Sequence, residues 1–250
     1  MKDEPNERRA FLTAAGALLA AGAVSRAAAQ TDTPAGTPAV VQKCMAFNKK
    51  WQGLVTPESA LAMLREGNKR FVTGNNIYCD LREQVKETAD QQAPYAAILG
   101  CIDSRVPPEL IFDLHLGDIF AARVAGNFVN TDILGSMEYA TKVAGAKLIV
   151  VLGHSHCGAI KGAVDNTQLG NLTAMLANIR PEVLKVKNIE GPQDSTNEHL
   201  VQAVAEQNAR DAAEMLSARS EVLRGLVGEG KLKIVPAMHD VGTGAINWFD

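Results

Sequence analysis

The chain has 250 residues, of which 46% are hydrophobic, and its formal net charge is -3. This length and composition are typical of a soluble protein whose main domain is long enough to bury a substantial core. The small negative charge gives no reason to expect nucleic acid or an anionic membrane as a partner. A small neutral or anionic substrate is compatible with it, because such a molecule responds only to the local field at a site.

The N-terminus has the three parts of a secretory signal. Arg8 and Arg9 precede an Ala-rich apolar run, and residues 27–29 (Ala-Ala-Ala) offer a cleavage site. The paired arginines with Phe-Leu shortly after resemble a twin-arginine leader, with a general secretory signal or an uncleaved anchor as alternatives. The apolar run is too short and weakly hydrophobic for stable membrane insertion. We predict a signal peptide over residues 1–29, a periplasmic protein, and a linker and N-terminal arm over residues 30–50.

A helix signal opens the segment that follows. Thr56 is a good N-cap residue, and Pro57 suits the first helical position. Apolar residues then recur at helical spacing as far as Phe71, and Gly74 ends the pattern. The sequence shows no internal repeat, so we predict one domain over residues 51–250.

Short apolar runs and helical patterns alternate through the rest of the chain. The runs, which we predict to be strands, cover residues 95–99, 118–124, 147–152 and 231–237. The helical patterns cover residues 107–115, 131–144, 169–186 and 197–226. Unbroken apolar strands that alternate with helices predict an α/β fold with a central, mostly parallel sheet flanked by helices. In such sheets, ligands bind outside the carboxyl ends of the strands.

Two of the predicted strands end in metal-ligating residues. Cys101 follows the first run, His154 follows the third, and Cys157 stands three residues further on. If the two strands are neighbours, their ends lie about 5 Å apart, within reach of one ion. Two thiolates and one imidazole suit Zn²⁺, and three protein ligands leave the fourth position open, as in catalytic zinc sites. Spacing alone also fits buried cysteines with a core histidine, or a structural site with a fourth ligand elsewhere.

Asp103 and Arg105 follow Cys101 closely and can pair side by side. A carboxylate beside a guanidinium keeps a low pKa and stays ionised. An ionised Asp103 near zinc can either take the fourth metal position and close the site, or accept a hydrogen bond from metal-bound water. The alternative is a surface ion pair of negligible energy.

The segments Cys101-Ile-Asp103-Ser-Arg105 and Gly153-His154-Ser-His-Cys157 together resemble the two signature motifs of the β-class carbonic anhydrases, in order and in spacing. Residues 123–127 and 239–244 resemble further segments of that family, so the similarity runs from about Trp51 to the C-terminus.

This resemblance implies the β-carbonic anhydrase fold, with zinc on Cys101, His154 and Cys157. Asp103 and Arg105 are then the catalytic dyad. It also implies a hydro-lyase, which hydrates CO₂ reversibly to bicarbonate and a proton through attack of zinc-bound hydroxide. The family is built on dimers, so we expect a homodimer or a higher homo-oligomer.

By matching position in the family, four residues should line a small pocket beside the metal: Gln92, Phe120, Ala125 and Tyr139. Carbon dioxide is apolar, so Phe120 and Ala125 suit its walls, and Gln92 can hydrogen-bond a bicarbonate oxygen. Each of the four is also compatible with simple core packing.

One position departs from part of the family. Members that close their site when bicarbonate binds a second pocket carry Trp three residues before the first ligand cysteine, where this chain has Ile98. Arg123 and Tyr139 match the other residues of that pocket. Without the Trp we predict an open site, with Asp103 paired to Arg105 and a metal ligand only in a closed state.

Two other functions use the same residues. The zinc site could hydrolyse CS₂ or COS, or the protein could bind zinc without catalysis, which would predict the loss of Asp103 or Arg105.

Outside the motifs, Cys44 and Cys79 are either a disulfide of an oxidising compartment or free thiols. His115 is expected to face solvent or a subunit interface.

Overall fold

The computed structural model describes residues 44–249. The predicted signal peptide and residues 30–43 of the predicted linker lie outside the described residues. At the start of the described part, Phe47 is buried, and its ring centroid lies 5.3 Å from that of Tyr95. Among residues 44–249, no helix is long and apolar enough to cross a membrane.

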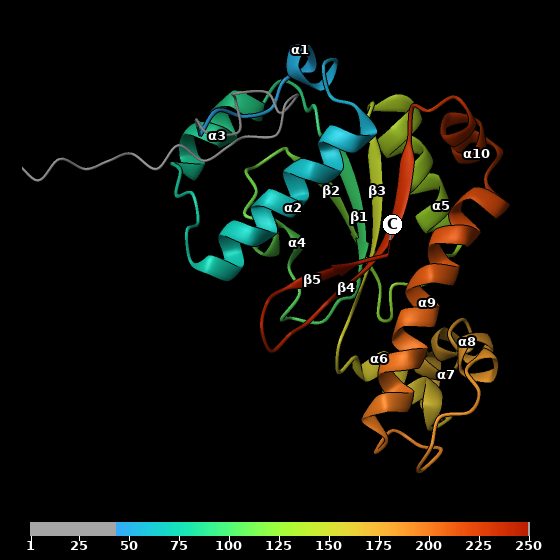
Figure 1. The fold of residues 1–250 in the computed structure, drawn as a ribbon. Helices are drawn as coiled ribbons and strands as arrows, with labels where there is room; N and C mark the ends of the chain where they lie inside the picture. Colours follow the sequence, from blue (N-terminus) through green and yellow to red (C-terminus); the bar gives the residue numbers. More distant parts are fainter. Residues whose placement is uncertain (1–43, 250) are drawn as a thin grey trace, which may run out of the picture. The chain divides into compact units, whose positions relative to one another are not determined.

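A five-stranded sheet in the order β2-β1-β3-β4-β5 forms the centre of the described chain (Figure 1). Four strands run parallel and correspond to the four predicted runs: β1 (Ala96–Gly100), β2 (Ile119–Arg123), β3 (Leu148–His154) and β4 (Lys233–His239). The fifth, β5 (Ile246–Trp248), pairs antiparallel with β4. The predicted α/β class with a mostly parallel sheet is therefore confirmed. β1 and β3 are neighbours, as a shared metal site requires.

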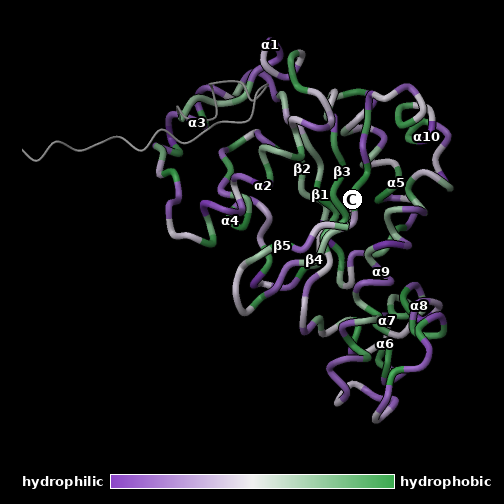
Figure 2. Tube along the Cα trace, in the orientation of Figure 1, coloured by the Kyte–Doolittle hydropathy of each residue, from purple (hydrophilic) through white to green (hydrophobic). Residues whose placement is uncertain are grey.

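Helices cover both faces of this sheet, and alternate strand residues supply the two cores. Leu99 and Val151 face the layer that contains α5 (Thr131–Glu138), α6 (Gly158–Val164) and α9 (Glu198–Arg219). Ile98 and Val150 face the other layer, which contains α2 (Pro57–Thr73). Figure 1 shows α2 and α9 on opposite sides of the strands, and Figure 2 shows that β1 and β3, which lie between them, are mainly hydrophobic.

The predicted start of α2 is correct in detail. The Thr56 side chain accepts a hydrogen bond from the Ser59 backbone N–H, and the Ser59 hydroxyl accepts one from the Thr56 N–H, which completes a capping box. Gly74 ends the helix in the left-handed conformation, which a glycine adopts at little cost.

Three predicted helices are shorter than expected. The pattern over residues 169–186 contains α7 (Gly170–Leu176) and α8 (Arg180–Lys185), because Pro181 suits only the first turn of a helix. The pattern over residues 197–226 is divided at Ser220, which is extended and caps α10 (Glu221–Gly228).

The pattern over residues 107–115 contains a single turn, α4 (Pro108–Ile111), after which Asp113 adopts a positive φ of 48°. The pattern over residues 131–144 contains α5 and η2 (Tyr139–Val143), a π-helical turn that continues α5. The prediction also missed α1 (Lys49–Gln52), α3 (Leu81–Thr88), α6 and β5. Most of these elements are too short to give a clear periodic pattern.

Candidate active site

The three predicted metal ligands converge at the carboxyl edge of the sheet. Cys101 follows β1, His154 ends β3, and Cys157 is the N-cap residue of α6. All three residues are buried, and their ligand atoms lie within 4.8 Å of one another. The fold produces this cluster because β1 and β3 are adjacent, with Gly100 of β1 paired to Leu152 of β3.

The orientation of His154 fits a metal ligand better than a core histidine. Its Nδ1 lies 2.9 Å from the Ser155 carbonyl oxygen, which can only accept, so Nδ1 carries the proton. The buried Nε2 then presents a lone pair and has no hydrogen-bond partner among the described residues. Ligating histidines are typically held in this way by a carbonyl on the second nitrogen. Two sulfurs and this nitrogen are a donor set that suits Zn²⁺.

The two thiols form a coupled pair in which Cys101 is the more acidic. A hydrogen bond from Cys157 is the main cause that lowers the pKa of Cys101, and the Gly126 N–H, at 3.3 Å from its Sγ, acts in the same direction. The same contact raises the pKa of Cys157, against the backbone N–H groups at the start of α6. The site therefore stabilises a thiolate, which is the form that binds a metal.

Gly126 is a site residue whose contribution was missed in the sequence. It has a positive φ of 79°, and a Cβ at this position would collide with the Ile179 side chain. Asn208 of α9 donates a hydrogen bond from Nδ2 to the Gly126 carbonyl oxygen at 2.8 Å and so fixes the loop. Asn208 is buried on the apolar side of a helix, and a polar residue in such a position was the available signal.

Asp103 and Arg105 form a two-point ion pair beside the cluster. Arg105 donates from Nε to Asp103 Oδ1 at 2.9 Å and from Nη2 to Oδ2 at 2.8 Å. These bonds hold the pKa of Asp103 well below its usual range. Asp103 Oδ2 is 4.0 Å from His154 Nε2, so the carboxylate borders the ligand cluster while it remains paired with Arg105. This is the pairing expected of an open site.

Arg123, at the end of β2, holds the loop that carries Asp103. Its Nε donates to the Cys101 carbonyl oxygen at 2.8 Å, and its Nη2 donates to the Asp103 carbonyl oxygen at 2.6 Å. In the sequence this residue matched only a bicarbonate pocket. In the structure its guanidinium binds the carbonyl groups on both sides of Ile102 and thereby fixes the position of the Asp103 backbone relative to the end of β1.

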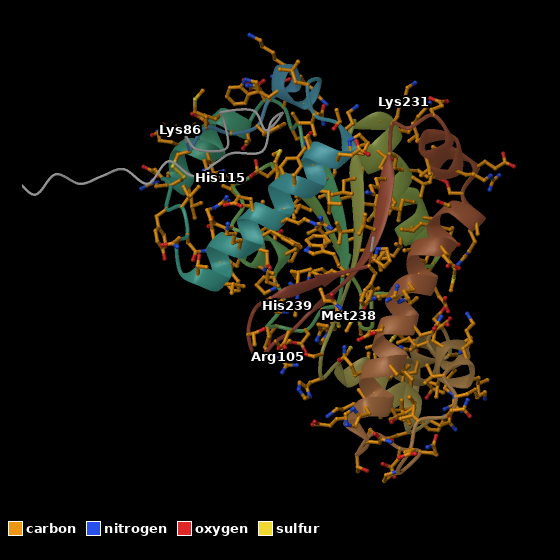
Figure 3. All side chains as sticks on the ribbon, viewed as in Figure 1. Lys86, Arg105, His115, Lys231, Met238 and His239 are labelled. Carbon is orange, nitrogen blue, oxygen red and sulfur yellow. A yellow bond between two sulfur atoms is a disulfide. The ribbon has the colours of Figure 1, made fainter. Side chains whose placement is uncertain are left out.

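His239 ends β4 directly beside His154, its partner in the strand register. It is buried, and neither ring nitrogen has a hydrogen-bond partner among residues 44–249. Burial lowers its pKa to about 4, so the ring is neutral near neutral pH. Figure 3 shows His239 close to Met238 and Arg105 at this edge of the sheet. His156, between the ligands, is exposed with a positive φ of 54°.

The four predicted pocket residues do not gather at one place in a single chain. Ala125 adjoins Gly126, which contacts the cluster of Cys101, His154 and Cys157. The other three lie toward the opposite end of β2, where Phe120 and Tyr139 have ring centroids 6.0 Å apart and Gln92 Nε2 is 3.5 Å from the Tyr139 hydroxyl. Phe120 precedes Arg123 by three residues, which is about 10 Å along a strand. Their role as pocket residues stays a prediction.

Known proteins resemble this chain along most of the described part. The carbonic anhydrase family model matches residues 96–246. Carbonic anhydrase 2 of Mycobacterium tuberculosis is 34% identical over 194 residues, which cover 75% of this chain and 90% of that protein. The carbonic anhydrase of Mycolicibacterium smegmatis is 31% identical over 199 residues, which cover 74% and 97%.

Solved structures share the fold. The β-carbonic anhydrase CcaA superposes with a TM-score of 0.61 at 27% identity and covers 77% of this chain and 88% of its own. The β-carbonic anhydrase CafA of Aspergillus fumigatus gives a TM-score of 0.58 at 26% identity and covers 77% and 90%.

With this sheet, this ligand cluster and these relatives, the chain belongs to the β class of carbonic anhydrases. It is an enzyme, and its reaction is the reversible hydration of CO₂ to bicarbonate and a proton.

Proposed function

We propose that CO₂ hydration takes place beside Cys101, His154 and Cys157, that these residues hold zinc, and that Asp103 and Arg105 act at the reacting end of the site. The observation that carries the proposal is the buried, unpartnered Nε2 of His154, which faces two sulfurs and lies 4.0 Å from the Asp103 carboxylate. When bound, zinc supplies the acidity of water, because it lowers the pKa of a bound water from 15.7 to about 7.

The dyad supplies orientation. Because Arg105 keeps Asp103 ionised, the carboxylate can accept a hydrogen bond but cannot donate one. An attacking water that donates a hydrogen bond to Asp103 turns its oxygen lone pair away from the carboxylate and toward CO₂. Arg123 holds the Asp103 backbone in place while this contact forms. Ile98, buried in the core beside α2, stands where the family members that close their site carry Trp, and this difference supports an open site in which Asp103 remains with Arg105.

Stopped-flow CO₂ hydration together with zinc analysis tests these assignments. We expect Asp103→Asn to retain zinc and to lose about 100-fold in kcat, a typical loss when the attacking group is no longer held in the reactive orientation. Cys101→Ala should lose both zinc and activity. Asp90→Asn, which changes an exposed aspartate, is the matched control and should behave as the wild type. Wild-type rates no better than buffer, or full activity in Asp103→Asn, would refute the proposed site.

A second copy of the chain should complete the site. Among residues 44–249, strand β2 has a paired neighbour on one side only, and a groove of about 840 Å³ lies between it and α5. In a two-fold dimer across this edge, the two β2 strands run antiparallel, so the start of one strand lies beside the end of the other. Gln92, Phe120 and Tyr139 of one subunit would then approach the metal cluster of the partner, which accounts for their distance from their own cluster.

We also propose export to the periplasm by the twin-arginine route. The leader pattern around Arg8 and Arg9 supports it. A second support is the disulfide between Cys44 and Cys79, since disulfides persist mainly in oxidising compartments. Replacing both arginines by lysine should leave the precursor in the cytoplasm. Unchanged periplasmic activity in fractionated cells would argue against this route.

A further inference from the structure

A second group of metal-ligating side chains lies outside the active site. Cys44 stands before α1, Cys79 precedes α3, and His115 follows α4. The two cysteines form a disulfide with a Cα–Cα distance of 5.3 Å, which decides between the two alternatives that the sequence left open. His115 was expected to face solvent or an interface, but its side chain is only 10% exposed, because the chain turns inward after α4. Figure 3 shows it beside α3, away from Arg105.

The imidazole of His115 is aimed at the sulfur pair. Its Nε2 lies 3.2 Å from Cys79 Sγ, and its Nδ1 lies 3.5 Å from Asp118 Oδ2. The same Asp118 oxygen accepts the His115 backbone N–H at 2.8 Å, so ring and carboxylate are held together. A carboxylate on one nitrogen and a soft ligand group on the other is the usual environment of a metal-binding histidine.

The distances are compatible with one shared ion. The ligand atoms of Cys44, Cys79 and His115 all lie within 4.8 Å of one another. Around tetrahedral zinc, a sulfur and a nitrogen ligand are roughly 3.6 Å apart, and two sulfurs roughly 3.8 Å apart. The nitrogen is thus nearly in place, and the sulfurs must separate by about 2 Å from disulfide-bond length. Cys44 is exposed, which leaves it room for this movement.

We propose that Cys44, Cys79 and His115 form a second metal site, which takes one Zn²⁺-like divalent ion only after a dithiol has reduced the Cys44–Cys79 bond. Reduction transfers two electrons and two protons from the dithiol to the two sulfurs, and the dithiol becomes a disulfide. The metal then displaces the two thiol protons. Disulfide and metal are mutually exclusive, because both use the same two sulfurs.

The two states hold the same segments together. In the oxidised state a covalent bond ties Cys44, at the start of the described chain, to Cys79, two residues before α3. In the metal-bound state the ion ties both segments to His115, while Asp118 orients the imidazole. On the proposed twin-arginine route, a chain that folds in the reducing cytoplasm carries the metal there. After export, exchange with a disulfide oxidant transfers two electrons from the two sulfurs to the oxidant, which becomes a dithiol, while the Cys44–Cys79 bond forms and the ion is released.

Zinc content in the two redox states tests this site, with the full chain and Zn²⁺ itself as the probe. The oxidised and the phosphine-reduced protein are each incubated with zinc, separated from free metal and analysed. We expect the reduced wild type to retain one zinc per chain more than the oxidised wild type. Because the measure is the difference between redox states, it does not depend on occupancy of the catalytic site. Equal zinc content in the two states would overturn the proposal.

Variants identify the ligands. Reduced Cys44→Ser/Cys79→Ser and reduced His115→Gln should lack the additional zinc, and Asp118→Asn should bind it about 10–100-fold more weakly. His199→Gln, which changes an exposed histidine on α9, is the matched control and should retain it. Retention of the additional zinc by the double cysteine variant, or unchanged affinity in His115→Gln, would contradict the assignment.

Alkylation provides a second measurement that does not depend on the stability of the reduced fold. Zinc should slow the alkylation of Cys44 and Cys79 in the reduced wild type, as mapped by peptide mass spectrometry, and should not protect Cys79 in His115→Gln. If reduction loosens the structure, zinc should restore the circular dichroism spectrum of the wild type but not that of the double variant. Zinc that neither protects the thiols nor restores the spectrum would overturn the proposal.

Discussion

Individual hydrogen bonds to backbone groups set the geometry of the active site. Three residues outside the predicted ligand set hold this geometry: Arg123, Gly126 and Asn208. Each forms a hydrogen bond to a predicted site residue or to a residue that contacts one. Arg123 binds the carbonyl groups of Cys101 and Asp103, and Gly126 donates to the Cys101 sulfur. We therefore treat Arg123 and Gly126 as positioning residues, and two predictions concern them.

Arg123→Lys should lower kcat about 10-fold with little change in KM, because an ammonium cannot bind both carbonyl groups in the planar geometry of a guanidinium. Zinc content should stay at the wild-type level, since Arg123 contacts no ligand atom of the cluster. Arg82→Lys, in an exposed part of α3, is the control. Stopped-flow kinetics that show equal kcat for the two variants would exclude a positioning role.

Gly126→Ala should lower the free energy of unfolding by about 1–3 kcal/mol, because the alanine must adopt a positive φ and its Cβ meets the Ile179 side chain. Gly225→Ala provides a contrast within the same protein. Gly225 is helical, and an added Cβ would meet no atom of the described chain within 4 Å, so alanine should stabilise by about 0.5–1 kcal/mol. Urea unfolding measures both free energies. A Gly126→Ala variant that is as stable as the wild type would contradict the prediction for the loop.

At the scale of elements, α8 and α9 enclose a charged cluster that the active site does not use. Glu182 is 1% exposed, its Oε2 lies 2.9 Å from Lys185 Nζ, and Lys185 also contacts Asp211 of α9. Burial, followed by the hydrogen bond with Asp211, raises the pKa of Glu182 to about 7. The same cluster raises the pKa of Lys185 and lowers that of Asp211.

This raised pKa makes part of the stability dependent on pH. Below about pH 4.5, Glu182 is protonated in both the folded and the unfolded chain. Between there and pH 7 the unfolded chain releases the proton first, so the free energy of unfolding falls as the pH rises and the loss is complete above the folded pKa of about 7. The lowered pKa of Asp211 changes the free energy of unfolding only near and below pH 3.8, the ordinary pKa of an aspartate, and therefore outside this window.

Glu182→Gln should therefore gain stability over the wild type as the pH rises from 5 to 8, by roughly 5–10 °C in Tm. The amide keeps the size of the side chain and removes its ionisation. Glu214→Gln, exposed on α9, is the matched control and should show no such trend. A Tm difference between Glu182→Gln and wild type that is the same at both pH values would show that Glu182 ionises equally in the folded and unfolded chains.

At the scale of the whole molecule, the unpaired edge of β2 determines how copies should associate. Ser136 is exposed on α5 and lines the groove beside this edge. Ser136→Arg should give a monomer in analytical ultracentrifugation and lower CO₂ hydration, because Gln92, Phe120 and Tyr139 would no longer reach a partner's site. Ala174→Arg, exposed on α7, should leave both the mass and the rate unchanged. A dimeric and fully active Ser136→Arg would place the interface elsewhere.

Much of the fold and of the candidate site follows from local sequence pattern. The four parallel strands lie close to the predicted runs, since buried strands need continuous apolar residues whatever their neighbours are. The start of α2 was correct because a cap acts within one turn. Short elements such as α3 and β5 were missed because they are too short to give a clear periodic pattern. Asp103 and Arg105, only two residues apart, could be paired from sequence alone.

The sequence by itself determined the chemical groups of the candidate active site: two thiols and an imidazole at strand ends, beside an aspartate and an arginine. These assignments depend on residue type and short spacing, both of which can be read directly from the sequence. Only the tertiary structure decided which distant groups meet. It brought His115 and Asp118 to the Cys44–Cys79 disulfide, Asn208 to Gly126, and Phe120 and Tyr139 to the far end of β2. Such contacts arise from strand order, chain reversal and the burial of whole faces, and none of these is encoded in any one segment.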